Sequence, residues 1–356
     1  KIYSAVIRNR IYSYLDNNKL VDRHAQKGFW PSVDGVFEHT QMLTQLMKEA
    51  KRHQRTIVVT LLDLCNAFGE IHHELIYSSL RYHKIPEGII SIIKNIYTDS
   101  WITIAHDNAL TPLVPVERGV LQGDPCSPLL FNICFNPLMQ AISQPKLRHL
   151  GYMWGPNANL RSRAWLQFAD DTVIVSDSIS NAQTLLNLNS AWCQWANMKI
   201  RIDNCCTFGM RKQSSKFVQF QPTLNINDSS IPTVKNDENF KYLGKIYNFT
   251  MNNSQIKAIL ETRLASLLKI TSDLKIKPQQ KMKIVKLYIP SQMNFDLRIY
   301  DIPYTWISQT LDRDITNAVR EWLGLPISSC VAEISSLPTA QGGLGIPSLR
   351  ETTAKL

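Results

Sequence analysis

The chain has 356 residues, 44% of them hydrophobic, which is enough for two or three packed units and excludes a disordered tail. Its 39 Lys and Arg against 29 Asp and Glu give a net charge of +10, which favours a polyanionic partner. We expect nucleic acid and no membrane, because no apolar run approaches a bilayer-spanning length.

The seven cysteines form no Cys-x-x-Cys pair and no Cys/His cluster at zinc spacing. This pattern predicts unpaired thiols in a reducing, intracellular compartment. The first residue is Lys and the chain opens directly on a helical pattern, so we expect an excised fragment of a longer protein.

The first part of the chain predicts helices around one buried strand and one strand pair. Apolar residues recur with helical spacing in four segments, residues 2–15, 36–51, 74–82 and 88–97. The clearest buried strand is 56–64, and a strand pair around a polar turn is predicted at 101–105 and 111–116.

The second part predicts a mixed region that gives way to helices. A Gly- and Pro-rich loop at 118–128 leads into an apolar helix at 129–142. Further predicted elements are a hairpin at 165–176, a helix at 180–196, a strand at 198–209 and short strands over 217–249. Beyond Asn253 the pattern is helical and basic, interrupted by Pro278, Pro290 and Pro303.

Two adjacent acids, Asp170 and Asp171, lie at the turn of the predicted hairpin. Carboxylates between apolar strands repel each other and are costly to desolvate, and a divalent cation offsets that cost. A turn also accommodates Asp for structural reasons. A second acid, Asp63, follows the buried strand, where helix capping is the alternative explanation.

Four segments, taken in order, resemble the palm motifs of reverse transcriptases. They are Asp63-Leu64-Cys65-Asn66-Ala67-Phe68, the run from Gly119 to Phe131, Phe168-Ala169-Asp170-Asp171, and Tyr242-Leu243-Gly244. Gln26-Lys27-Gly28-Phe29, Asp34 to His39, and Gly342-Gly343-Leu344-Gly345-Ile346 are similar to segments of non-LTR (LINE-like) retrotransposons. The last of these speaks against a group II intron or telomerase-like enzyme.

The resemblance implies an α/β (α+β) right-hand polymerase with an antiparallel palm sheet and packed helices. Incomplete fingers would comprise 1–57 and 74–115, the palm 58–73 and 116–250, and an all-helical thumb 251–356. The family's endonuclease and zinc-knuckle modules are expected in the parent protein, outside this fragment, and the parent is expected to work in the nucleus.

The resemblance also assigns roles to individual residues. Asp63 and Asp170 would be the main ligands of two Mg²⁺ ions, or Mn²⁺ in their place, with Asp171 a less direct ligand. Phe68 would be the steric gate against ribonucleotides, although core packing is an alternative. Gln122 and Gly123 would contact the nucleotide, and Tyr242, Leu243 and Gly244 would grip the primer, with a surface turn as the alternative.

Basic residues complete the predicted site. Lys27 and Arg23 are candidates for the triphosphate. In the thumb, seven residues would follow the phosphates of the nucleic acid, with a solvated helix face as the alternative: Arg263, Lys269, Lys275, Lys277, Lys281, Lys283 and Lys286. The apolar positions between them include Leu264, Leu267, Leu268, Ile284 and Leu287.

One residue departs from the family pattern. Asn204 occupies the position where a Lys often precedes Cys and is thought to protonate the leaving pyrophosphate, which an amide cannot do. Lys199 or Arg211 could substitute.

The sequence therefore predicts Mg²⁺-dependent extension of a DNA primer on an RNA template from deoxynucleoside triphosphates, as in target-primed reverse transcription of a retroelement. The rival hypothesis is a non-catalytic nucleic-acid-binding scaffold derived from such an enzyme.

Overall fold

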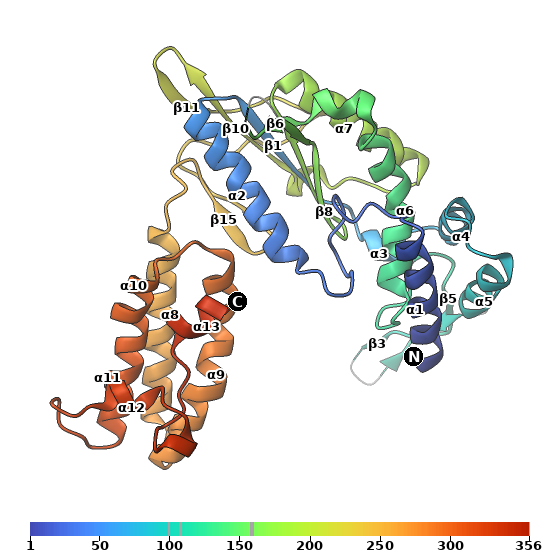
Figure 1. Cartoon of the computed structure of the whole chain (residues 1–356). Coiled ribbons are helices and arrows are strands. Elements are labelled where there is room, and N and C mark those ends of the chain that lie inside the picture. Colours follow the sequence, from blue (N-terminus) through green and yellow to red (C-terminus); the bar gives the residue numbers. More distant parts are fainter. Residues whose placement is uncertain (99, 107–108, 157–159, 356) are drawn as a thin grey trace. The chain divides into compact units, whose positions relative to one another are not determined.

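A computed structural model describes residues 1–98, 100–106, 109–156 and 160–355. The chain divides into two compact units, Lys1–Phe249 and Thr250–Leu356 (Figure 1). The assignment of particular residues to fingers, palm and thumb stays a prediction.

The first unit is built on a five-stranded antiparallel sheet in the order β11-β10-β1-β9-β8. The strands are β1 (Ile57–Leu62), β8 (Trp165–Phe168), β9 (Asp171–Ser176), β10 (Cys206–Gln213) and β11 (Lys216–Phe220). Strand β1 takes the central place because its apolar side chains suit burial on both faces. Its antiparallel pairing with β9 sets Leu62 opposite Thr172.

Seven helices accompany the sheet in the first unit's described residues: α1 (Ile2–Asn17), α2 (Gly35–His53), α3 (Ala67–Glu70), α4 (His73–Tyr82), α5 (Glu87–Tyr97), α6 (Ser127–Ile142) and α7 (Ile179–Trp195). Helices α6 and α7 pack on the sheet, where Leu138 and Leu185 share a core cluster with Val58 and Ile174. Helix α2 contacts β8. A second core cluster joins α1, α4 and α5 to the aromatic side chains of α6.

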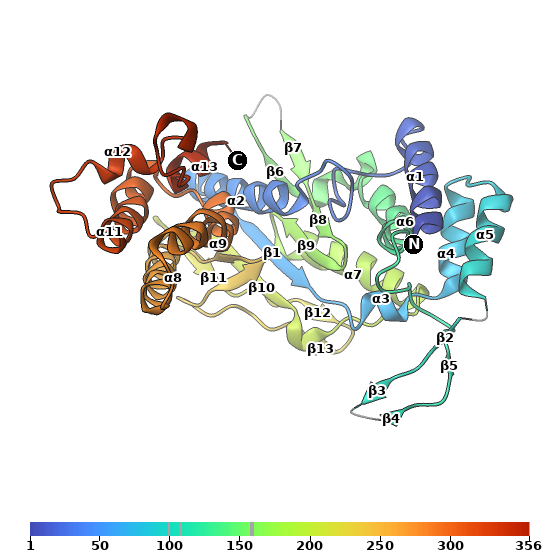
Figure 2. The ribbon, with the colours of Figure 1, turned by 90° about the horizontal axis from the view of Figure 1, so that it is seen from below.

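Short hairpins extend from these layers. The predicted strand pair near residue 105 is present as two short antiparallel pairs. Strand β2 (Trp101–Ile102) pairs with β5 (Val114–Pro115), and β3 (Ala105–His106) pairs with β4 (Ala109–Leu110). Together these strands form an arm that projects beyond α4 and α5 (Figure 2). Residues 107–108 of its turn lie outside the described residues. The other hairpins are β6 (Tyr152–Trp154) with β7 (Arg161–Arg163), β12 (Asn225–Ile226) with β13 (Ser229–Ser230), and β14 (Phe240–Tyr242) with β15 (Lys245–Tyr247).

The described residues of the second unit contain helices and no strand. The helices are α8 (Ser254–Asp273), α9 (Pro278–Ile299), α10 (Tyr304–Trp306), a π-helix at Ile307–Asp312, α11 (Arg313–Trp322), α12 (Val331–Ser335), a 3-10 helix at Thr339–Gln341 and α13 (Leu349–Lys355). Pro278 begins α9 as predicted, but Pro290 lies inside it. The helix continues because Ile289, Pro290 and Met293 are all buried, and their packing stabilises the backbone across the missing hydrogen bond. Leu287, one of the apolar positions named above, is 71% exposed.

The predicted α/β (α+β) class with an antiparallel sheet and packed helices is confirmed. No helix in the described ranges is both long and apolar enough to cross a membrane.

Two of the three leucines of α7, Leu185 and Leu188, allow a test of this packing. Leu185 is fully buried in the sheet-side core, whereas Leu188 is 38% exposed. Leu185→Ala should lower the free energy of unfolding by about 2–5 kcal/mol, because it removes buried surface and leaves a cavity. Leu188→Ala is the matched control and should cost well under half as much, as measured by urea denaturation. Equal losses would contradict the packing described.

Candidate active site

Three carboxylates gather where β1 and β9 meet. Asp170 lies in the turn between β8 and β9, Asp171 opens β9, and Asp63 directly follows β1. Because Leu62 is opposite Thr172, the next step of the same register sets Asp63 opposite Asp171. The fold thus brings together two acidic segments that are about a hundred residues apart in sequence.

The three negative charges influence one another. Burial raises the pKa of Asp170, and the charge of Asp63 adds to this effect. Displacement of water by surrounding protein atoms raises the pKa of Asp171 to about 6, with further contributions from the charges of Asp170 and Asp63. The ionised acids are therefore held in a place that disfavours negative charge.

This donor set fits a hard divalent cation. Carboxylate oxygens are the ligands that Mg²⁺ prefers, and the cation would offset the repulsion. Within the described residues, no group of three or more Asp, Glu, His or Cys side chains is already arranged so that it could hold a metal ion. Mg²⁺ usually keeps water and substrate oxygens as its other ligands, so an open set of three acids suits it.

A pocket of about 700 Å³ lies on the Asp170 side of the acids. Phe68, Gln122, Gly123 and Asp170, all named from the sequence, line it together with Arg8. Gly123 has φ +78°, a left-handed conformation that favours glycine, and the loop exposes its backbone to the pocket. Three of the five residues predicted to bind the nucleotide, Phe68, Gln122 and Gly123, therefore share one pocket.

Phe68 both packs and lines the pocket. Its ring stacks on Phe131, with centroids 4.1 Å apart, and meets the edge of Phe29 at 6.1 Å. The backbone N–H of Val120 donates to the carbonyl of Phe68 at 2.8 Å, which ties this segment to the glutamine loop. The packing fixes the position of the ring and leaves it accessible to the pocket.

A second pocket, of about 310 Å³, lies on the Asp171 side. Asp63, Asp171, Asn204, Tyr242 and Leu243 are among its lining residues. Leu243 (φ +44°) and Gly244 (φ +83°) form the two-residue turn of the β14–β15 hairpin, a geometry typical of tight hairpins. Tyr242 is 3% exposed, so this segment is more than a surface turn.

The segment around Asn204 folds against Asp63. Its first half is not the predicted strand, since β10 begins only at Cys206 and Ile202–Asn204 form a 3-10 turn. This turn lets the Asn204 Nδ2 donate to Asp63 Oδ2 at 2.9 Å. The Arg201 guanidinium lies 3.8 Å from the same oxygen.

Arg201 is thus a cation at the site that sequence reasoning missed. Arg211, one of the two substitutes considered, lies over the Phe220 ring at 4.7 Å. Neither Lys199 nor Arg211 is among the residues that line the two pockets. The signal for Arg201 was its place in the segment that also carries Asn204.

The two predicted triphosphate ligands, Lys27 and Arg23, form ion pairs in this structure. The Lys27 ammonium is 2.6 Å from Glu38, and Arg23 is 2.6 Å from Asp16. Neither is among the residues lining the pocket that holds Phe68 and Asp170, where Arg8 is the basic side chain. Each of these two cations is paired with a carboxylate in this structure, and their role as triphosphate ligands stays a prediction.

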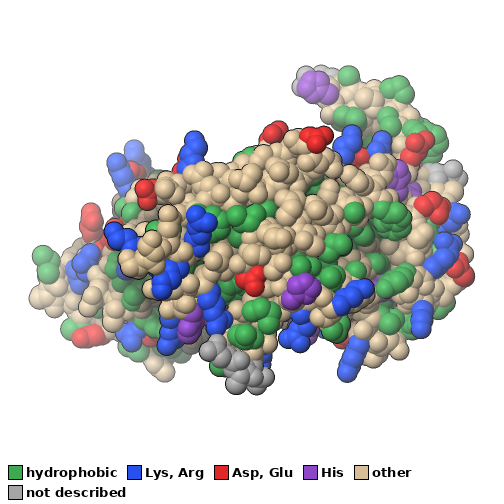
Figure 3. Space-filling view, turned by 90° about the horizontal axis from the view of Figure 1, so that it is seen from above, with side chains coloured by type: hydrophobic (Ala, Val, Ile, Leu, Met, Phe, Trp, Pro, Cys, Tyr) green, Lys and Arg blue, Asp and Glu red, His purple; other side chains and the backbone are tan. Residues whose placement is uncertain are grey.

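The basic residues of the second unit fall into two groups. The Arg263 guanidinium pairs with Asp296 at 2.6 Å, and Lys281 donates to the Ser272 carbonyl and lies over the Trp322 ring, so both hold helices together. The remaining five are exposed, namely Lys269, Lys275, Lys277, Lys283 and Lys286. More generally, Lys and Arg side chains are scattered across the face drawn in Figure 3.

Comparison with known proteins agrees with this geometry. A sequence profile described as "Reverse transcriptase (RNA-dependent DNA polymerase)" matches residues 1–247. The chain belongs to the reverse transcriptase family. The match includes all three acids, Phe68, the glutamine loop and the β14–β15 hairpin.

The curated relatives are non-LTR retrotransposon proteins. The chain is 29% identical to the Pol polyprotein of the type-2 element R2DM of Drosophila melanogaster and 26% identical to that of the type-1 element R2 of Nasonia vitripennis. Both alignments cover 91% of this chain and 30% of the relative, so the chain spans under a third of their length. The resemblance to non-LTR reverse transcriptases is thus confirmed.

Among solved structures, apo telomerase from Candida Tropicalis is similar at 9% identity and a TM-score of 0.49, over 98% of this chain and 55% of that one. Telomerase from Candida albicans, in complex with a fragment of telomeric RNA, gives a TM-score of 0.44 at 10% identity, over 99% of this chain and 56% of that one.

The raised pKa of Asp171 predicts a pH-dependent stability. Its folded pKa of about 6 exceeds the unfolded value of about 3.9, so the folded state binds more protons between these values. Without divalent cations, the contribution of Asp171 to the free energy of unfolding should fall as the pH rises from about 4 to about 6. Urea denaturation across this range should show a smaller fall for Asp171→Asn than for the parent chain. Identical slopes would contradict the assignment.

Proposed function

We propose that this chain is an RNA-directed DNA polymerase core that extends a primer 3′-OH on an RNA template by two-metal nucleotidyl transfer. The convergence of Asp63, Asp170 and Asp171 between two pockets carries this proposal. Membership of the reverse transcriptase family supports it.

Each of the two pockets would bind one substrate, either the incoming nucleotide or the primer end. The pocket with Phe68, Gln122 and Arg8 would take the incoming deoxynucleoside triphosphate, because Arg8 offers positive charge and Phe68 an apolar wall. The pocket with Tyr242 and Leu243 would take the primer end, since it opens beside Asp63 and Asp171. The reacting 3′ oxygen and α-phosphate would then meet at the acids.

Asp63, Asp170 and Asp171 would hold two Mg²⁺ ions, or Mn²⁺ in their place. When bound, the ions supply positive charge that stabilises the attacking oxygen and the leaving pyrophosphate. Asn204 and Arg201 hold one oxygen of Asp63 and so orient its carboxylate. The five exposed lysines of the second unit would contact the template and primer phosphates without reading sequence.

In its parent element this core would carry out target-primed reverse transcription, in the nucleus. The relatives are retrotransposon Pol polyproteins about three times as long as the matched region. Nicking of target DNA and capture of the element's RNA would then belong to endonuclease and zinc-knuckle modules elsewhere in the parent protein.

The first test is primer extension by the purified chain on an RNA template. Asp170→Ala should lower incorporation at least about 100-fold, equivalent to about 2.7 kcal/mol of transition-state stabilisation. EDTA should abolish incorporation and added Mg²⁺ restore it. Asp228→Ala, in the exposed turn between β12 and β13, is the matched control and should leave the rate unchanged.

Activity that survives Asp170→Ala or EDTA would refute the proposal. Tight binding of primer and template by the parent chain, without incorporation under any divalent cation, would favour the non-catalytic scaffold instead.

The role of Phe68 can be separated from its packing. Phe68→Val should raise ribonucleotide incorporation relative to deoxynucleotide incorporation about tenfold or more, because the wall that excludes the 2′ hydroxyl becomes smaller. Phe131→Leu removes the ring stacked beneath Phe68 and leaves the gate in place, so it should lower stability with little change in sugar selection. Equal changes in selection for both variants would reduce Phe68 to a packing residue.

A further inference from the structure

The turn that carries the catalytic acids has an unusual backbone. Ala169, which precedes Asp170, has φ +55°, a left-handed conformation that costs a residue with a Cβ roughly 1–2 kcal/mol. Ala169 is only 3% exposed, so water does not form hydrogen bonds with its backbone N–H and carbonyl. Something else in the protein must stabilise this conformation.

We propose that Gln26 is a positioning residue that holds Ala169 in this conformation and so aims Asp170 at the reacting atoms; this inference rests on the proposed polymerase activity. The Gln26 Oε1 accepts the N–H of Ala169 at 2.9 Å, and its Nε2 donates to the carbonyl of Ala169 at 3.2 Å. One side chain therefore satisfies both backbone groups of the residue beside the acid.

The chemistry requires an amide at this position. A carboxylate at position 26 would lose the donor and place a buried charge against a carbonyl. Methionine would leave the Ala169 N–H without an acceptor and remove one of the two bonds to the Ala169 carbonyl. The Gln167 side chain, from β8, also donates to the Ala169 carbonyl, at 2.8 Å. In the part of the chain that the structure describes, it makes no hydrogen bond with the Ala169 N–H. Gln26 alone links both groups.

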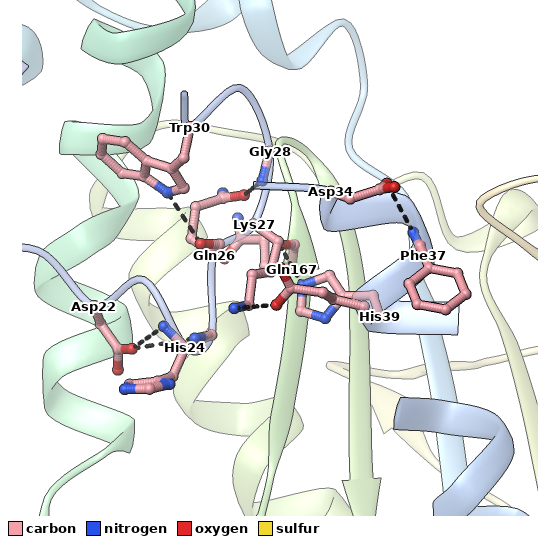
Figure 4. Close-up of polar contacts among 12 residues, drawn as sticks. Asp22, His24, Gln26, Lys27, Gly28, Trp30, Asp34, Phe37, His39 and Gln167 are labelled. Carbon is pink, nitrogen blue, oxygen red and sulfur yellow. Dashed lines mark hydrogen bonds and ion pairs between the residues drawn. The ribbon is translucent and has the colours of Figure 1, made fainter. Parts of the chain in front are cut away.

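Gln26 is itself held rigidly. It is 3% exposed, its own carbonyl accepts the Trp30 indole N–H at 3.0 Å, and the N–H of Gly28 donates to its Oε1 at 2.8 Å. Figure 4 shows the Trp30 indole and the Gly28 backbone directed at Gln26. The Gln167 carbonyl accepts the backbone N–H of Lys27 at 2.9 Å. His39 from α2 lies 2.9 Å from the same carbonyl. The segment from Gln26 to Gly28 thus forms a clamp on the end of β8.

Gly28 completes the clamp by its lack of a side chain. A Cβ at this position would lie 2.6 Å from the backbone nitrogen of Ala169, closer than real Cβ contacts allow. The two segments therefore touch backbone to backbone. A single methyl group added here would push the catalytic turn without removing any hydrogen-bonding group.

The test compares the rate constant for single-turnover nucleotide incorporation with an independent structural readout. Gln26→Met and Gly28→Ala should each lower that rate constant about 10- to 100-fold, because a small displacement of a catalytic group is costly. The affinity for template and primer should change by less than about threefold. Using the rate constant rather than the amplitude excludes molecules that fail to fold.

Gln183 provides a matched control. Its amide makes the same pair of bonds to the backbone of Asn225, accepting the N–H at 3.0 Å and donating to the carbonyl at 2.8 Å. Gln183→Met should leave the rate constant unchanged. A loss equal to that of Gln26→Met would overturn the proposal.

Two further results distinguish positioning from general loss of structure. In an Ala169→Gly background the turn adopts its conformation without strain, so Gln26→Met should cost several-fold less in rate. Hydrogen exchange of the parent chain should show protection at the Ala169 amide that Gln26→Met removes and Gln183→Met does not. The exchange result stands even if no polymerase activity is found, and unchanged protection would overturn the inference.

Discussion

The close approach of three negative charges at the end of an antiparallel strand pair is the constraint on which the first unit depends. The β1–β9 register brings Asp63 beside Asp171, and the hairpin turn adds Asp170. Burial and mutual repulsion disfavour this arrangement, as the raised pKa values of Asp170 and Asp171 show. The surrounding segments therefore have to hold the acids in place, and a bound cation would offset their charge.

The surrounding segments hold each acid by different means. Asp63 is bound by its neighbours on the Arg201–Asn204 turn, which contact one carboxylate oxygen. Asp170 is positioned through the backbone, by the amide of Gln26 acting on Ala169. Asp171 begins β9, so the sheet itself fixes its place. Two pockets open on either side of the group, which suits a reaction between two substrates.

Several basic residues show why charge alone predicts contacts poorly. Lys27, Arg23 and Arg263 each pair with a carboxylate 2.6 Å away. Those partners are seven, eleven or thirty-three residues distant in the sequence, and nothing in a list of charges marks them. Arg8 and Arg201, which do lie at the pockets or the acids, carry no more distinctive local pattern than the others.

The sequence by itself determined the sheet strands around the acids, the turn between β8 and β9 and the family, because these depend on local apolar patterning and on motif order. It also predicted that the three acids, Phe68 and the glutamine loop belong to one site, and the structure brings them together. Only the tertiary structure decided which side chains act on the acids. The Gln26 and Ala169 contact joins residues 143 positions apart, and the Asn204 and Asp63 contact joins residues 141 apart. Hydrogen bonds over such separations exist only after the sheet has set its register, so no local pattern could reveal them.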